Sequence, residues 1–251
     1  MENISGIALL DTNSLSVFGQ KINKYFNPDK DLSFFLAKKQ KTEYIYNVVY
    51  LEGNPMTYPE VETLLDGITV GGHKISDELQ VLNQNKSVEY LFNAVRNNEF
   101  KLDKETLCEL NGLVSFEESL AWGKFRTGNI KIGGTDYLPP ESDKLDSIFS
   151  DGLTKINQIS HPVVKAISIF GFLCRNQFFW DGNKRTARLA ANGILLSNGY
   201  FILNIKSKDK QIFNEIMIDF YNTGDYKKLI GFFTDYYIKQ NLLNAKIRPN
   251  E

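Results

Sequence analysis

Residues 179–188 read Phe-Trp-Asp-Gly-Asn-Lys-Arg-Thr-Ala-Arg, and this stretch decides the fold. A turn-forming Gly-Asn pair follows a long apolar segment and opens a helix, so the pattern predicts two helices joined by a short loop. The helix before the loop is expected to be buried, because residues 163–173 are apolar nearly all round. The N-terminus of the second helix presents unpaired backbone N–H groups and a partial positive charge, which hold anions well.

The side chains of this loop predict a phosphate site. Backbone N–H groups around a glycine form a concave nest for a diphosphate, and guanidinium groups supply planar donors to phosphate oxygens. One carboxylate beside phosphates and water is a common magnesium site. The predicted phosphate-binding residues are Gly182, Asn183, Lys184, Arg185 and Arg188, and the predicted magnesium ligand is Asp181. The alternative is an ordinary helix cap with solvated arginines, which the combined string and its place between two helices disfavour.

Just upstream stands Gln177, where phosphoryl or nucleotidyl transfer would need a proton acceptor. A hydroxyl nucleophile reacts poorly at neutral pH unless a base removes its proton, and an amide has no basicity. His161 lies at the far end of the preceding helix, roughly 24 Å away at the rise of an α-helix. The sequence therefore predicts a nucleotide site that lacks its base.

Composition bounds the class of protein. The chain has 251 residues and a formal net charge of -1, so a nucleic-acid partner is not expected. Two cysteines and two histidines predict neither a disulfide framework nor a zinc cluster. No apolar run approaches the roughly 20 residues that span a bilayer, and no secretory signal is visible. These features predict a soluble, cytoplasmic protein with no membrane partner.

Helical signals dominate, so the expected fold class is mainly α, a helical bundle with one small β-hairpin. Residues 31–54 are expected to form one helix, which ends at Glu52-Gly53-Asn54. Residues 128–140 contain two short alternating runs around a Gly-Gly turn, which predicts a hairpin. Three parts are expected along the chain: an N-terminal region over 1–70, a core over 71–205, and C-terminal helices over 206–251.

The stretch from Gln177 to Arg188 resembles the motif of the Fic/Doc family, His-x-Phe-x-Asp/Glu-Gly-Asn-Gly/Lys-Arg-x-x-Arg, and the likeness extends over roughly residues 43–199. The resemblance implies a helical Fic core that binds ATP and Mg²⁺ and transfers AMP to a hydroxyl of a target protein. It also implies that Gln177 replaces the catalytic histidine and that the hairpin is a flap that clamps the target. The implied flap residues are Ile130, Lys131, Ile132, Gly133, Gly134, Thr135 and Asp136.

Two further details follow from the resemblance. Glu52 matches the glutamate of the family's inhibitory helix, which implies that it pairs with Arg188 and displaces the ATP γ-phosphate, although Val48 stands at the usual Ser/Thr position of that motif. Lys184 occupies a position that is most often glycine. Lysine there is shared with the Doc branch, which is associated with phosphate transfer.

The sequence is compatible with three functions. The first is a protein adenylyltransferase scaffold for a target Ser, Thr or Tyr hydroxyl, with AMP transfer lost or weak because of Gln177. The second is a non-catalytic nucleotide-binding module that regulates or captures a protein partner. The third is phosphate transfer as in the Doc branch. The sequence names neither the target nor the oligomeric state, nor whether the chain is exported.

Overall fold

The computed structural model describes residues 12–246, with side chains over 15–245, so residues 1–11 and 247–251 of the predicted terminal regions lie outside it. Within the described range the chain is mainly helical and has no strand, in agreement with the predicted class. The α-helices are α1 (Thr12–Asn23), α2 (Lys30–Lys39), α3 (Lys41–Leu51), α4 (Tyr58–Leu65), α5 (Ile75–Arg96), α6 (Lys104–Val114), α7 (Leu145–Asn157), α8 (Pro162–Asn176), α9 (Asn183–Ser197), α10 (Lys210–Thr223) and α11 (Tyr226–Asn241). Short 3₁₀ turns add Ser142–Lys144, Ser207–Asp209 and Asn244–Lys246.

Helices α8 and α9 form the centre of the molecule. Helix α8 is apolar nearly all round and most of its residues are buried, as the sequence predicts. Helix α9 contributes to two hydrophobic clusters. Its Ala187 and Ala191 belong to the cluster that contains the buried residues of α8. Its Leu189 and Leu196 belong to a second cluster, with residues of α3 and α5. Burying apolar surface from both sides stabilises this helix pair and holds the loop between α8 and α9 on a rigid base.

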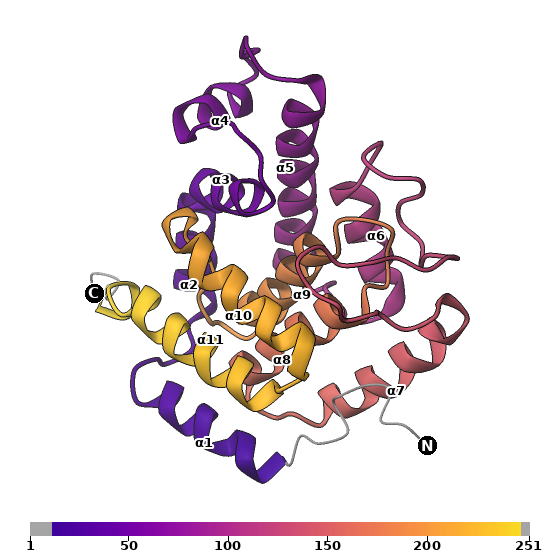
Figure 1. Cartoon of the computed structure of the whole chain (residues 1–251). Helices are drawn as coiled ribbons and strands as arrows, with labels where there is room; N and C mark the ends of the chain where they lie inside the picture. Colours follow the sequence, from indigo (N-terminus) through magenta and orange to yellow (C-terminus); the bar gives the residue numbers. More distant parts are fainter. Residues whose placement is uncertain (1–11, 247–251) are drawn as a thin grey trace.

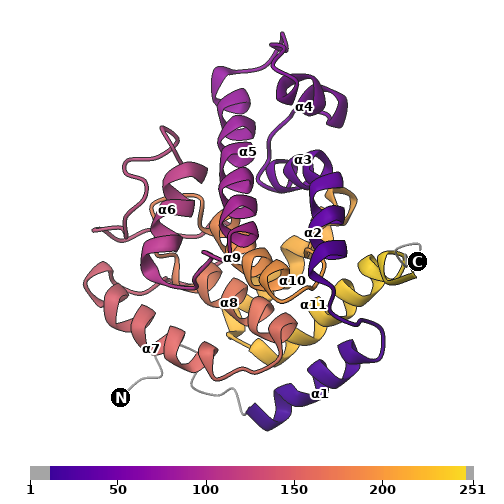
Figure 2. The ribbon, with the colours of Figure 1, turned by 180° about the vertical axis from the view of Figure 1, so that it is seen from behind.

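The predicted helix over 31–54 is two helices. Asp29 caps α2, its Oδ1 accepting from the Leu32 N–H at 2.9 Å, and the chain turns at Gln40 before α3 begins. The break lets α3 follow its own direction and pack against α5. Figures 1 and 2 show α3, α4 and the upper part of α5 at one end of the molecule, with α1 and α7 at the opposite end. Glu52 caps the C-terminus of α3 and points back toward α9.

The predicted hairpin over 128–140 is a loop with a turn at Gly133-Gly134, not a pair of strands. No backbone–backbone hydrogen bond joins its two arms across these residues, all of which the structure describes. Side chains hold the segment instead, with Thr135 bonded to Asn222 of α10 and the Arg175 guanidinium 4.2 Å from the centre of the Tyr137 ring. We call residues 128–140 the flap. In the part of the chain that the structure covers, no helix is long and apolar enough to span a membrane.

Candidate nucleotide site

The loop between α8 and α9 changes direction at two left-handed residues. Gln177 ends α8 with φ 50°, and Gly182 precedes α9 with φ 71°. Between them Phe178 and Phe179 are almost completely buried, at 0% and 1% exposure. The two rings anchor the loop in the core, so the residues around them face outward in fixed positions.

Two buried asparagines hold this loop from below. Asn183 accepts from the Phe179 N–H at 2.9 Å and donates to the Phe179 carbonyl at 2.8 Å. Asn111 of α6 donates to the Asp181 carbonyl at 2.9 Å and accepts from the Gly123 N–H at 3.1 Å. Backbone groups of the loop and of Gly123 that would otherwise be unsatisfied are thereby paired. The Asn183 side chain is therefore used to hold the loop, so only the backbone of Asn183 is left to bind a ligand.

Gly182 is required at its position, and we predict that Gly182→Ala lowers the free energy of unfolding by about 2–4 kcal/mol. A Cβ there would lie 2.2 Å from Ser115 Oγ and 2.9 Å from Val114 Cγ1, at a positive φ of 71°. Urea unfolding followed by circular dichroism measures the loss. Adding Ser115→Ala should recover only part of it, since the backbone strain stays, and full recovery would contradict the role of φ.

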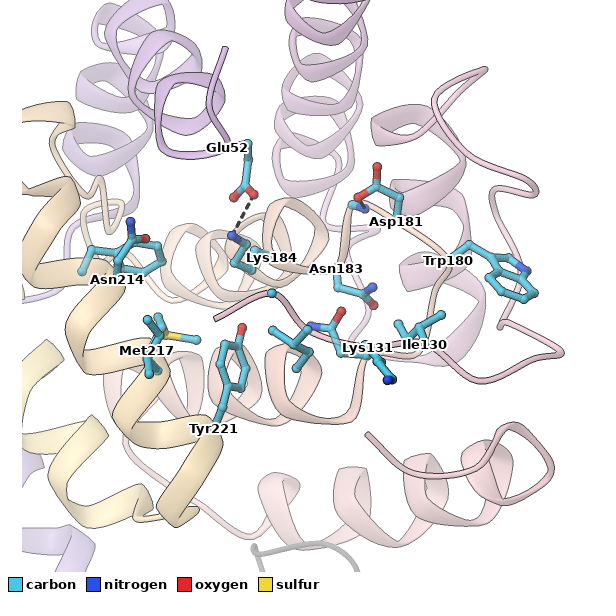
Figure 3. A pocket seen from close by; sticks show the side chains of 16 residues that line it. Glu52, Ile130, Lys131, Trp180, Asp181, Asn183, Lys184, Asn214, Met217 and Tyr221 are labelled. Carbon is cyan, nitrogen blue, oxygen red and sulfur yellow. Dashed lines mark hydrogen bonds and ion pairs between the residues drawn. The ribbon is translucent and has the colours of Figure 1, made fainter. Parts of the chain in front are cut away.

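A cavity of about 480 Å³ opens directly above this loop, within the size range of small-ligand sites. Its walls come from four parts of the chain: the end of α3, the flap, the α8–α9 loop and α10 (Figure 3). The lining residues are Glu52, Ile130, Lys131, Ile132, Gly133, Gln177, Trp180, Asp181, Gly182, Asn183, Lys184, Phe213, Asn214, Met217, Ile218 and Tyr221. Residues more than 150 positions apart in the sequence therefore face one space.

Glu52 lies between two cations of α9. Its carboxylate is 2.7 Å from Arg188 Nη1 and 2.9 Å from Lys184 Nζ, and its side chain is only 15% exposed. Figure 3 shows the pair with Lys184. Burial by itself would raise the pKa of Glu52, but the charges and hydrogen bonds of Lys184 and Arg188 outweigh it and lower the pKa to about 2. The carboxylate is therefore ionised at neutral pH and occupies a position that strongly favours an anion.

The low pKa of Glu52 predicts a pH dependence of stability. The pKa falls from an ordinary 4.5 to about 2 on folding, so the stabilisation is fully present above pH 4.5 and is lost as the pH falls toward 2. We expect the difference in unfolding free energy between the native protein and Glu52→Gln to shrink across that window. Urea unfolding at several pH values measures it, and a difference that stays constant would contradict the ion pair.

The two arginines of the motif have different surroundings. Arg185 is 2% exposed and is bound by Glu118 at 2.9 Å and by the Val114 carbonyl at 3.0 Å, outside the residues that line the cavity. Arg188 also lies outside the lining of the cavity and is 3% exposed. It lies 5.0 Å from the centre of the Phe213 ring and meets the lining residue Glu52 through Nη1 alone. Its Nε and Nη2 donors are buried and have no partner among the described residues. Arg188 thus meets the cavity wall through Glu52, and two of its donors are left without an acceptor in the described part of the chain.

Asp181 is exposed at the rim of the cavity. Its Oδ1 accepts from the Gly182 N–H at 2.6 Å, and its Oδ2 lies 3.8 Å from Arg185. No cluster of three or more His, Cys, Asp or Glu residues that could hold a metal occurs in the described range. A single carboxylate fits Mg²⁺ only when phosphates and water complete the coordination, which is the usual arrangement at nucleotide sites.

Gln177 reaches the cavity but carries no base. Its Nε2 donates to the Cys174 carbonyl at 2.6 Å, which turns the amide back toward the end of α8. The Cys174 thiol does not replace it, because burial raises its pKa to about 12. His161 caps the start of α8, its Nδ1 accepting from the Val163 N–H, and neither His161 nor His73 lines the cavity.

Comparison with known proteins agrees with this arrangement. Residues 101–195 match the sequence model of the Fic/DOC family. The protein adenylyltransferase Fic of Aedes aegypti is 26% identical over 215 residues, which cover 82% of this chain and 42% of that protein. The enzyme of the same name from Nematostella vectensis is 27% identical over 251 residues, covering 96% of this chain and 58% of the relative.

The fold is also similar to that of a solved Fic-domain structure. A Fic-domain-containing signalling protein from Bacteroides thetaiotaomicron superposes with a TM-score of 0.73 at 21% identity, covering 93% of this chain and 96% of that one. The chain therefore contains a region, residues 101–195, that is similar to the Fic/DOC family, and its fold resembles that of a Fic-domain protein. The chain spans about half the length of the curated relatives it matches.

The structure brings most residues of the Fic motif together, but not all predicted site residues. Asp181, Gly182, Asn183 and Lys184 line the cavity. Arg185 and Arg188 lie outside the lining, where Glu118 pairs with the first and Glu52 with the second. The flap contributes residues 130–133, while the residues after its turn lie outside the lining.

Several residues that build the site were missed by sequence reasoning. Asn111 and Glu118 support the motif from about 70 residues away, and nothing in their local sequence marks them. The wall from α10 does have a sequence signal, because Phe213, Met217 and Tyr221 recur every four residues and so share one helix face.

Proposed function

We propose that this chain is a Fic-type protein adenylyltransferase scaffold that binds ATP with Mg²⁺ in the cavity above the Fic motif. AMP transfer to a Ser, Thr or Tyr hydroxyl of a target protein is lost or weak, because Gln177 stands where the base is needed. Glu52 acts as an internal competitor of the nucleotide. The two free cysteines fit the reducing cytosol that the sequence predicts as its location.

One observation carries this proposal: the Glu52 carboxylate is bound by Lys184 and Arg188 at the wall of the cavity. Two cations that hold a carboxylate at 2.7 and 2.9 Å would also hold a phosphate oxygen, since both groups accept charge-assisted hydrogen bonds. The two unpartnered donors of Arg188 support the same assignment, because buried guanidinium N–H groups normally have acceptors. When Glu52 withdraws, the site offers its full charge to a phosphate group.

The remaining groups fit the rest of a bound nucleotide. The α9 N-terminus directs the Gly182 and Asn183 backbone toward the cavity, where it favours a diphosphate. Asp181 is the residue that would hold Mg²⁺ beside those phosphates, and the ion would neutralise their charge. The apolar wall of Phe213, Met217 and Ile218 suits the uncharged parts of the ligand.

The transfer step is where this chain departs from an active enzyme. An attacking hydroxyl must lose its proton, and a positioned base contributes on the order of 10²–10⁴-fold to the rate. The Gln177 amide can donate or accept a hydrogen bond but cannot take that proton. This favours the alternative that the chain is a nucleotide-binding regulatory module, which captures a protein partner at the flap without modifying it.

Lys184 favours a second alternative, phosphate transfer as in the Doc branch. Its ammonium is half-buried beside Glu52 at the cavity wall, so it could hold a terminal phosphate in either orientation of the nucleotide. The two transfer reactions differ in which phosphorus atom reaches the target.

ATP labelled at the α- or the γ-phosphate separates these functions. The native protein, Glu52→Gly and Gln177→His are each incubated with labelled ATP, magnesium and cell lysate. Label from the α-phosphate supports AMP transfer, and label only from the γ-phosphate supports phosphate transfer. Binding without transfer supports the regulatory module. If calorimetry finds no ATP binding by any of the three proteins, the nucleotide site itself is refuted.

A further inference from the structure

Arg126 lies in the segment between α6 and the flap, and it is one of the largest fully buried side chains, with 2% exposure. Its guanidinium makes three hydrogen bonds, all to backbone carbonyls. Nε donates to the Gln177 carbonyl at 2.6 Å, Nη1 donates to the Gly128 carbonyl at 2.7 Å, and Nη2 donates to the Pro140 carbonyl. The Arg126 backbone N–H also donates to the Phe178 carbonyl at 2.9 Å.

This environment is unusual for a cation. No carboxylate of the described residues forms an ion pair with Arg126, and burial lowers its pKa. Burying a charge without a counter-charge is costly, so the positive charge does not explain why an arginine is buried at this position. A guanidinium does offer a rigid planar fork whose donors diverge in fixed directions, which an ammonium cannot match. The contacts therefore favour a geometric role.

The three carbonyls belong to two functional parts. Gly128 and Pro140 are the two ends of the flap, whose arms share no backbone–backbone hydrogen bond of their own. Gln177 is the left-handed residue at the position of the missing base, with φ 50°. One side chain thus closes the base of the flap and fixes the backbone of residue 177. At its tip the flap is held separately, by Thr135 and Asn222.

We propose that Arg126 is a positioning residue that couples the flap to residue 177, so that the two shift together. This proposal rests on the proposed function for two assignments: residue 177 lies where the transfer would occur, and the flap binds the target. Under that assignment, the guanidinium sets the spacing between the bound target segment and the group that would act on its hydroxyl.

Two probes that need no nucleotide test the coupling. Tryptic cleavage after Lys131, which is exposed in the flap, reports flap opening. Exchange of the Phe179 amide, which is bonded to Asn183 Oδ1, reports opening of the loop that contains residue 177. For Arg126→Met we expect both rates to rise roughly tenfold or more, as loss of hydrogen bonds from a charged group implies. Lys124→Met, at an exposed position in the same segment, should change neither rate.

Arg126→Lys keeps the positive charge but not the planar fork of donors, so it should restore neither rate fully. Complete rescue would show that charge alone matters and would overturn the proposal.

Thr135→Val tests the coupling without changing Arg126, in case Arg126→Met does not fold, because it releases only the flap tip. The proposal expects this variant to speed Phe179 exchange as well as cleavage, through an intact Arg126. Faster cleavage with unchanged Phe179 exchange, in either Thr135→Val or folded Arg126→Met, would refute the coupling. Failure of ATP binding would refute the proposed function and leave this test standing.

Discussion

Replacing Glu52 with glycine is expected to raise the affinity of the cavity for ATP by roughly 10- to 100-fold. The carboxylate at 2.7 Å from Arg188 and 2.9 Å from Lys184 competes with phosphate oxygens for the same two cations. Its removal frees both of them and leaves Arg188 with a third unpaired donor. Isothermal titration calorimetry with ATP and magnesium measures the change.

The control is Glu62→Gln on α4, an exposed glutamate of the same N-terminal region, which should leave the affinity unchanged. Arg188→Met tests the route of the effect. If Glu52 competes mainly through Arg188, the gain from Glu52→Gly should largely disappear in the double variant, as a double-mutant cycle would show. Equal ATP affinity of the native protein and a folded Glu52→Gly variant would contradict the competitor role of Glu52.

Replacing Gln177 with histidine is expected to raise the rate of AMP transfer by roughly 10²–10⁴-fold, and most clearly in the Glu52→Gly background. The backbone is suited to the change, since residue 177 has φ 50° and histidine is among the residues that tolerate the left-handed region well. The imidazole would replace an amide that now donates to the Cys174 carbonyl. Transfer of label from α-labelled ATP to protein measures the gain.

Gln177→Asn is the matched control, because asparagine also tolerates a positive φ but offers no base. It should fold and bind ATP without gaining transfer. If Gln177→His binds ATP and still transfers nothing to any protein in a lysate, the missing base is not what limits this chain, and the regulatory function becomes the better explanation. Similar gains in the histidine and asparagine variants would show that backbone geometry, not basicity, had changed.

The sequence predicted the local features of the site well. Periodicity and turn chemistry gave the buried α8, the loop at Gly182 and the start of α9, because these depend on residues close together in the chain. The hairpin over 128–140 was predicted from alternation and a Gly-Gly turn, yet only the turn is present. Strand pairing needs backbone hydrogen bonds between the arms, and here the Arg126 side chain holds the flap ends instead.

By itself, the sequence determined the helix–loop–helix of the Fic motif and the chemical limit at Gln177, since an amide lacks basicity in any fold. The tertiary structure decided which partner each arginine has. Arg185 and Arg188 lie three residues apart on one helix, but Glu118 pairs with the first and Glu52 with the second. Those carboxylates come from distant segments, Glu52 from the end of α3 and Glu118 from the segment after α6, so tertiary packing sets their positions. The local sequence determines which charged side chains the motif contains, whereas tertiary packing determines which of them remain available to a ligand.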